Sequence, residues 1–194
     1  MHEGMLAPVQ HPSLILMPLL IGTFIGTISN NIVNVPLREI ATELRVPVSR
    51  GVLVVVGFML TFAVAMPLTG WLGDRIGRRR VYCAALVALA VSSVGAAAAP
   101  TLEVLVAFRM AQGLATAAVL PAVMGMIADI FTERQRGRAL GWWAGVNGLG
   151  QAVGPTFGGV MAQFASWRWV FVPAVPLALL ALVTTIRLVP ADRP

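Results

Sequence analysis

The sequence predicts an all-α membrane protein built as a bundle of six transmembrane helices. Of the 194 residues, 58% are hydrophobic and only 11% are charged, and the mean hydropathy is +0.84. A soluble globular domain has a very different balance. The apolar residues form six long runs that use nearly the whole chain, and most of the basic residues lie between these runs.

Each run is long enough to cross the hydrocarbon core as a helix, which takes about 20 mostly apolar residues. A helix satisfies its own backbone N–H and C=O groups, as the interior of a bilayer requires. The predicted spans are residues 14–35, 52–72, 81–99, 102–127, 139–164 and 169–189. We expect loops of a few residues between them, so that residues 1–194 form a single transmembrane domain.

All 14 basic residues are arginine, and their positions predict the orientation of the bundle. With a cytoplasmic N-terminus, the outer side receives only Arg38, Arg45, Arg50 and Arg168. The cytoplasmic side receives the larger set, namely Arg75, Arg78, Arg79, Arg80, Arg134, Arg136, Arg138, Arg187 and Arg193. This bias satisfies the positive-inside rule. We therefore expect a multi-pass protein of the cell membrane (inner or plasma membrane) with both termini in the cytoplasm, and no nucleic-acid partner despite the net charge of +6.

Residues 70–80, GWLGDRIGRRR, form a short charged turn between the second and third runs. Its glycines allow close helix approach and a tight reversal of the chain. A carboxylate at this place can pair with the arginines or face the N-terminus of a neighbouring helix. The spacing resembles the signature loop of the major facilitator superfamily, on Gly70, Leu72, Asp74, Arg75, Gly77, Arg78 and Arg79, together with Gly73 one helical turn after Gly70. Without that resemblance, an ordinary positive-inside turn explains the composition equally well.

The fourth run contains an arginine at mid-span, Arg109, within LVAFRMAQGLATA. A charge there costs about 2.5 kcal/mol or more on insertion scales, so Arg109 is expected to face protein or water. Gln112 and Thr116 follow at helical spacing and extend one polar stripe. With Gly113, the pattern is similar to the R-x-x-Q-G motif of the same family, which implies a role for the arginine in proton transfer or in the charge network. The alternative is an arginine that snorkels to the membrane boundary.

The fifth run is rich in glycine at regular spacing. Gly150, Gly154 and Gly158 stand four apart, so one face of the helix is bare and can pack closely on another helix. Pro155 removes a backbone hydrogen bond and is expected to bend the helix. The full set resembles the motif of the drug:proton antiporter branch, the fourteen-helix multidrug efflux type, on Gly141, Gly150, Gly154, Pro155, Gly158 and Gly159.

The first run ends in ISNNIVNVPL, which resembles the same subfamily with one important departure. Ser29 stands where the resemblance implies an aspartate. The acidic residues lie in tails, in loops or near the ends of the predicted spans, so no mid-membrane acid is left to carry a proton. Polar residues still follow one side of the helix, and with the fourth helix they are candidates to line a central cavity, namely Thr27, Ser29, Asn30, Asn31, Asn34 and Thr116. Hydrogen bonds that only join helices are the alternative.

The resemblance covers the N-terminal six-helix half of a family transporter, a 3+3 inverted repeat. It implies gradient-driven efflux of a drug or metabolite by alternating access, with a second six-helix half or a homodimer as partner. The alternative is a truncated or regulatory six-helix protein without transport activity. An enzyme is not expected, because the only histidines, His2 and His11, precede the first span and cannot form a catalytic dyad within the membrane. We predict no cofactor, no catalytic residues and no metal site.

Overall fold

The computed structural model describes residues 12–192, and over this range the chain is almost entirely helical. His2, Glu3, His11 and Arg193 lie outside the described residues. The helices in chain order are α1 (Pro12–Asn31), α2 (Leu37–Glu43), α3 (Val48–Gly51), α4 (Leu53–Ile76), α5 (Arg78–Ala97), α6 (Leu102–Ile130), α7 (Glu133–Phe164), the 3₁₀ helix η1 (Trp167–Val170) and α8 (Ala174–Leu188).

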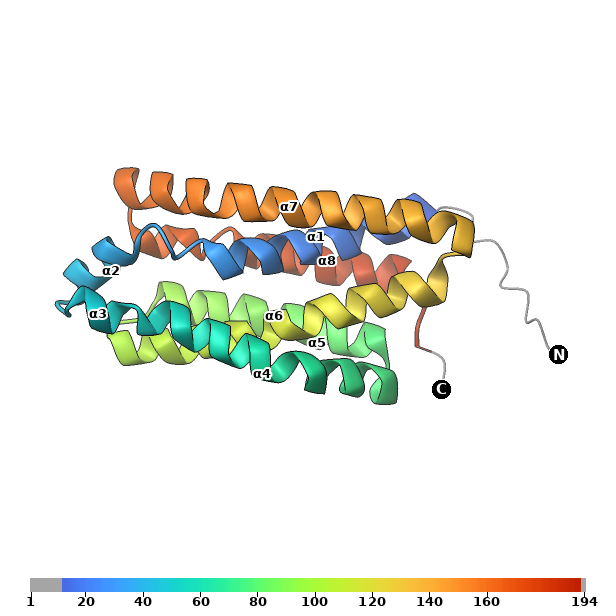
Figure 1. The fold of residues 1–194 in the computed structure, drawn as a ribbon, viewed down its shortest axis with the longest axis horizontal. Coiled ribbons are helices and arrows are strands. Elements are labelled where there is room, and N and C mark those ends of the chain that lie inside the picture. The colour runs from blue at the N-terminus through green and yellow to red at the C-terminus, as the bar shows by residue number, and fades with distance from the viewer. Residues whose placement is uncertain (1–11, 193–194) are drawn as a thin grey trace.

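The six long helices run side by side along the bundle (Figure 1), in agreement with the predicted all-α bundle. Five segments in residues 12–192 are long and apolar enough to cross a membrane: Leu14–Asn31, Val48–Ile76, Arg78–Ala97, Leu102–Ile130 and Trp167–Leu188. The remaining long helix, α7, has 32 residues, but its first turns are charged and glycines and amides dilute its apolar part. Its length and position, rather than its hydropathy, make it the sixth member of the bundle.

The bundle consists of two groups of three helices. Helices α1, α7 and α8 lie together in the upper part of Figure 1, and α4, α5 and α6 lie below them. Within the groups, α1 packs on α7 and α8, while α6 packs on α4 and α5. Contacts of α1 with α6 and of α5 with α8 join the groups. The start of α1 and the end of α8 lie at one end of the bundle, and α2 and α3 lie at the other (Figure 1).

The observed helix ends differ from the predicted spans by a few residues, for local reasons. The first helix ends at Asn31 rather than at residue 35, in a turn that precedes Pro36, where the proline disfavours helical backbone in the residue before it. Helix α7 begins at Glu133 rather than at residue 139, because a helix continues beyond the membrane through its charged turns. The last span begins as the 3₁₀ turn η1 and becomes α8 after Pro173.

The connection between the first two spans is longer and more structured than predicted, since it contains α2 and α3. An ion pair joins Glu43 of α2 to Arg168 of η1, and Trp167 Nε1 donates to Glu43 Oε2 at 2.8 Å. Arg168 also donates to the carbonyl oxygen of Ala99 at 3.0 Å, at the end of α5. These contacts tie three connecting segments together at this end of the bundle.

The core is apolar at both ends of the bundle. Leu19, Tyr82 and Ile127 belong to a buried cluster near the end of α6, and Val54 and Leu105 to another near its start. The outward faces of the helices are also apolar, as lipid contact requires, and α4 exposes the largest such face, with Leu60, Val64, Leu68 and Trp71. Between these two clusters, the bundle holds a smaller apolar cluster and a polar layer.

Candidate functional site

Arg109 of α6 forms the centre of this polar layer. Its side chain is fully buried, with 0% exposure. One guanidinium nitrogen, Nη1, donates to the carbonyl oxygen of Ser29 in α1 at 2.8 Å and to Gln112 Oε1 at 2.9 Å. Nε donates to the carbonyl oxygen of Val54 in α4 at 3.3 Å, at the long end of the hydrogen-bond range. As expected, the arginine faces protein, and it does not snorkel to the boundary.

Two further contacts extend this cluster. The guanidinium carbon of Arg109 lies 4.3 Å from the centroid of the Phe58 ring, in cation–π geometry. Gln112 Nε2 donates to Ser93 Oγ in α5 at 2.9 Å. Arg109 and Gln112 therefore connect helices α1, α4, α5 and α6. All the groups that contact the arginine within residues 12–192 are neutral.

Gly113 allows α4 and α6 to approach closely beside this cluster. A side chain at Gly113 would collide with Thr61 Oγ1 and with the backbone carbonyl of Phe58. The third member of the predicted R-x-x-Q-G motif therefore has a packing role that differs from the hydrogen bonds of Arg109 and Gln112.

A polar cavity of about 210 Å³ lies between α1, α6 and α7, with Phe62 of α4 at its edge. Hydroxyl, amide and indole groups line it together with a few apolar side chains. Thr116 is 6% exposed, and its hydroxyl has no hydrogen-bond partner in the described chain. The indole Nε1 of Trp143 is likewise buried without a partner. The cavity thus places polar side chains inside a membrane bundle, and two buried polar atoms in its wall have no partner in the described chain.

The structure brings most of the predicted cavity residues together. Thr27, Asn30, Asn31 and Thr116 line the polar cavity, along with Thr23. Ser29 does not: it faces a second, apolar cavity on the other side of α1. Asn34 is also misplaced by the prediction, because α1 ends at Asn31 and Asn34 is exposed in the turn that follows.

The sequence analysis missed the contribution of α7 to the polar cavity. Trp143, Asn147 and Gln151 of α7 line its wall. Asn147 Oδ1 accepts a hydrogen bond from Thr27 Oγ1 at 3.0 Å and another from Gln151 Nε2 at 3.3 Å. The signal was present in the sequence, because two amides four residues apart near mid-span mark one polar face of a helix.

The glycine face of α7 packs against α1. A side chain at Gly158 would meet the backbone carbonyl of Ile32, and one at Gly150 would meet Thr27 Cβ at 2.9 Å. At Gly154 the neighbour is Asn31 Cβ at 3.3 Å. Gly159 lies against Val35. Gly141, by contrast, has no neighbour within 4 Å among residues 12–192, so not all positions of the predicted motif serve this contact.

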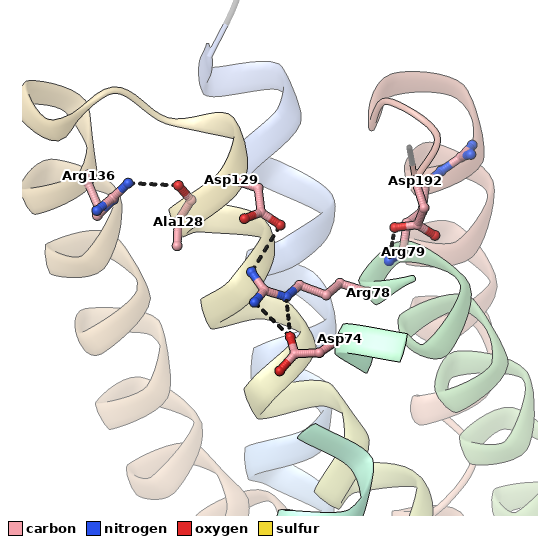
Figure 2. Close-up of polar contacts among 7 residues, drawn as sticks. All are labelled: Asp74, Arg78, Arg79, Ala128, Asp129, Arg136 and Asp192. Atoms are coloured by element: carbon pink, nitrogen blue, oxygen red, sulfur yellow. Dashed lines mark hydrogen bonds and ion pairs between the residues drawn. The ribbon is translucent and has the colours of Figure 1, made fainter. Parts of the chain in front are cut away.

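The charged turn of residues 70–80 lies at the end of the bundle where α8 ends (Figure 2). Arg78 reaches between two carboxylates. Its Nη2 lies 2.7 Å from Asp74 Oδ1, and its Nη1 lies 2.9 Å from Asp129 Oδ2 near the end of α6. Asp74, Arg78 and Asp129, which we call the acidic–arginine triad, therefore join the ends of α4, α5 and α6.

Asp192, in the segment after α8, caps the start of α5. Its carboxylate accepts hydrogen bonds from the backbone N–H groups of Arg79 at 2.9 Å and Arg80 at 3.0 Å. The side chain of Arg79 donates in turn to the carbonyl of Ile186 at 2.8 Å. Gly77 has a φ of 109°, which favours glycine, and a side chain there would collide with Asp192.

Comparison with known proteins identifies the family. A sequence profile described as the Major Facilitator Superfamily matches residues 19–194. The chain belongs to the Major Facilitator Superfamily. Membership in this family of transporters agrees with the predicted resemblance and with the expectation that the chain is not an enzyme.

Several superfamily members are similar to the chain. MdtD of Serratia proteamaculans (strain 568), which bears the name of a multidrug resistance protein, is 33% identical over 172 residues, covering 89% of this chain and 36% of that protein. An uncharacterized MFS-type transporter of Mycobacterium tuberculosis is 30% identical over 182 residues, covering 94% of this chain and 31% of the other. The chain thus spans about a third of the length of these curated relatives.

A solved structure shares the fold. It is a bacterial homolog of the human lysosomal transporter Spinster, in an inward-facing and occupied conformation, with a TM-score of 0.82 and 17% sequence identity. The match covers 94% of this chain and 45% of that one. The chain has the fold of a superfamily half with six long helices, the N-terminal half of the predicted resemblance.

In this superfamily member, the charged turn makes electrostatic contacts within the chain, where Arg78 pairs with Asp129 and Asp192 caps the start of α5. Arg75 differs, since its guanidinium lies 5.2 Å from the ring of the exposed Trp71. The last turns of α4, with Gly70 and Gly73 on their inner side against Pro121 and Arg78, leave Arg75 on the surface.

Proposed function

We propose that the chain is one six-helix half of a gradient-driven secondary transporter that exports small molecules by alternating access. The polar cavity between α1, α6 and α7 would form one wall of the substrate pathway. The observation that carries this proposal is a cavity lined by hydroxyl and amide side chains, with the buried and unpartnered Thr116 hydroxyl and Trp143 indole in its wall, inside a bundle whose outer faces are apolar. A helix bundle that only anchors a protein has no need to keep such groups without partners.

The substrate we propose is a drug or metabolite that combines apolar surface with a few hydrogen-bonding groups. The name of the MdtD relative supports a drug, and the mixed lining supports such a molecule. Phe62, Val119 and Leu120 offer apolar contact, while Asn147 and Gln151 offer amides. Pockets for small molecules commonly combine these two kinds of group.

We further propose that Arg109, Gln112 and Gly113 couple movements of the helices around the cavity. Arg109 binds the backbones of α1 and α4, so a change in its hydrogen bonds alters how these helices pack. A helix-one acid does not take part, since Ser29 occupies that position. Proton coupling would then use groups of the other half or the exposed Asp74 and Asp129 at the end of the bundle.

A second six-helix half, or a second copy of this chain, is the proposed partner. Transporters of this kind place substrate between two halves near the midplane of the membrane. The glycine-rich face of α7 would let α7 pack closely on α1, so that these two helices form one continuous wall of the cavity. The charged turn, with Gly70, Gly73, Asp74, Arg75 and Arg79, would close one face against that partner.

We propose the cell membrane as location, with both termini in the cytoplasm. The arginine-rich turn of residues 70–80 lies at the same end of the bundle as the start of α1 and the end of α8 (Figure 1). The positive-inside rule then places this end in the cytoplasm.

The test is dye or drug flux in proteoliposomes driven by a pH gradient, with the chain alone and with a second half supplied. We expect flux when both halves are present. Asn147→Leu removes an amide from the cavity and should reduce this flux, whereas Asn34→Leu alters an exposed position outside the cavity and should not. Folded protein without flux in either setting would overturn the proposal and favour a six-helix protein with no transport activity of its own.

A further inference from the structure

A second cavity, of about 190 Å³, lies on the opposite side of α1 from the polar cavity. Phe24 and Ile28 of α1 form its floor. Val153 and Phe157 of α7 line one wall, and Leu177 of α8 lines the other. We call it the α7–α8 cavity.

The two cavities occupy opposite faces of α1. Successive residues of an α-helix turn by about 100°, so Thr23, Thr27 and Asn30 share one face. Ile25, Ile28 and Ile32 lie on the other face, where they line the α7–α8 cavity. Because the polar cavity is the proposed side of the substrate and the second half, the α7–α8 cavity faces away from both, toward the bilayer.

The lining of the α7–α8 cavity leaves little for a polar ligand to bind. Gln112 reaches its floor, but its amide oxygen already accepts from Arg109 and its amide nitrogen already donates to Ser93. The carbonyl of Ser29 likewise accepts from Arg109, and the Ser29 hydroxyl is one further small polar group in the lining. The other lining side chains are apolar.

The cavity is open between α7 and α8. Both helices pack on α1, and η1 closes the end of the gap by packing on α7. Val153, Phe157, Ala174 and Leu177 are each partly exposed along this opening. Trp169, 55% exposed in η1, lies just before α8 and suits the level of the lipid headgroups. The opening therefore lies where acyl chains begin.

We propose that the α7–α8 cavity binds an acyl chain of a membrane lipid. An engineered apolar cavity of about 150 Å³ stays dry and binds benzene, so a somewhat larger apolar cavity has room for several methylene groups. Each buried methylene contributes about 0.8 kcal/mol when it leaves water, but here the chain leaves other lipid. Affinity must come from close packing against the aromatic side chains Phe24 and Phe157.

The test uses the full chain in nanodiscs that contain a phosphatidylcholine with a photoreactive diazirine on one acyl chain. After illumination, mass spectrometry locates the labelled peptides. We expect labelling at residues 153–157 and 174–177 to exceed that of the exposed face of α4, with Leu60, Val64 and Leu68, which reports ordinary surrounding lipid. Transport activity is not needed, so the result is independent of the proposed function.

Val153→Trp fills the cavity and should abolish the excess labelling. Val160→Trp is the matched control, because Val160 lies two turns later on α7, is 43% exposed and does not line the cavity. If Val153→Trp does not fold, Ala174→Leu narrows the cavity from the opposite wall and should also lower the labelling. Labelling equal to that of α4, or excess labelling that persists in the folded filled variants, would overturn the proposal.

Discussion

At the scale of single residues, Arg109 shows how a membrane bundle holds a charge among neutral groups. Burial of an unpaired charge is expensive, and hydrogen bonds to the charged group offset part of that cost. Arg109 has two backbone carbonyls, one amide and one aromatic face around it, from three helices. The planar guanidinium can reach these partners together because its donors point in several fixed directions.

Arg109→Met is expected to lower the free energy of unfolding by about 1–3 kcal/mol, because it leaves Gln112 without its partner and removes the link between α1 and α4. Arg109→Lys keeps the charge but loses the planar set of N–H donors, so its free energy of unfolding should fall between those of Arg109→Met and the wild type. Thermal unfolding of the purified chain in detergent measures both changes. A lysine variant as stable as the wild type would show that charge alone, and not the geometry of the N–H donors, holds the helices.

At the scale of elements, α7 combines packing and chemistry on one face, because Gly154 and Gly158 lie two helical turns after Asn147 and Gln151. Gly150, Gly154 and Gly158 bring its backbone onto α1, while Asn147 and Gln151 point into the polar cavity. Close approach allows Asn147 to hydrogen-bond Thr27 directly. The glycines therefore set the distance between α1 and the two amides of α7.

Gly158→Ala is expected to destabilise the chain by about 1–3 kcal/mol, since the added methyl group meets the backbone carbonyl of Ile32, which cannot move aside without shifting α1. Gly145→Ala is the matched control in the same helix, because the described part of the chain places nothing within 4 Å of a methyl group added at Gly145. There, the methyl group should stabilise the helix by about 0.5–1 kcal/mol. Thermal unfolding should show that the free energy of unfolding falls for Gly158→Ala and rises for Gly145→Ala. Equal changes in the two variants would argue against close packing of α7 on α1.

The acidic–arginine triad joins three helices through one side chain. Asp74 is 64% exposed and Asp129 63%, so Asp74→Asn and Asp129→Asn should each cost only about 0.2–1 kcal/mol. The two effects should not add, because both carboxylates share Arg78. Unfolding of the single and double variants at low and high salt measures this coupling. Arg75→Gln, outside the triad, is the control and should show no coupling with Asp129→Asn.

At the scale of the whole molecule, the two ends of the bundle differ in their charged contacts. At the end with the start of α1 and the end of α8, the acidic–arginine triad lies beside arginines that donate to backbone carbonyls, such as Arg136 to Ala128 (Figures 1 and 2). At the other end, Glu43 pairs with Arg168, and Arg50 lies 3.2 Å from Glu103. This asymmetry makes the orientation in the membrane directly testable.

In a Cys83→Ala background, Gly137→Cys and Ser49→Cys report opposite ends of the bundle. Both positions are exposed, and no described residue lies within 4 Å of a side chain added at Gly137, so neither change should disturb the fold. A maleimide that cannot cross the membrane should label Ser49→Cys on intact cells and Gly137→Cys only after the cells are opened. The reverse pattern would show that the arginine-rich end faces outward.

Hydropathy alone was enough to predict five of the six long helices, because each of these must be apolar along its length to lie in lipid. Helix α7 is less apolar than the others, since its glycines pack on α1 and its amides line the polar cavity rather than contact lipid. The mid-span cost of a charge was likewise enough to predict that Arg109 is buried within the protein. Its partners were not predictable, because backbone carbonyls leave no mark in a sequence.

By itself, the sequence determined the helices, the bare face of α7 and the tight turn at Gly77, which all follow from the chemistry of neighbouring residues. Tertiary structure alone decided what these features meet. It sent Ser29 and Thr27 to opposite cavities, placed Asn147 beside Thr27, and paired Arg78 with an aspartate 51 residues away. The reason is physical: the rotation of α1 and the register between helices depend on how whole surfaces pack, and no local pattern records them.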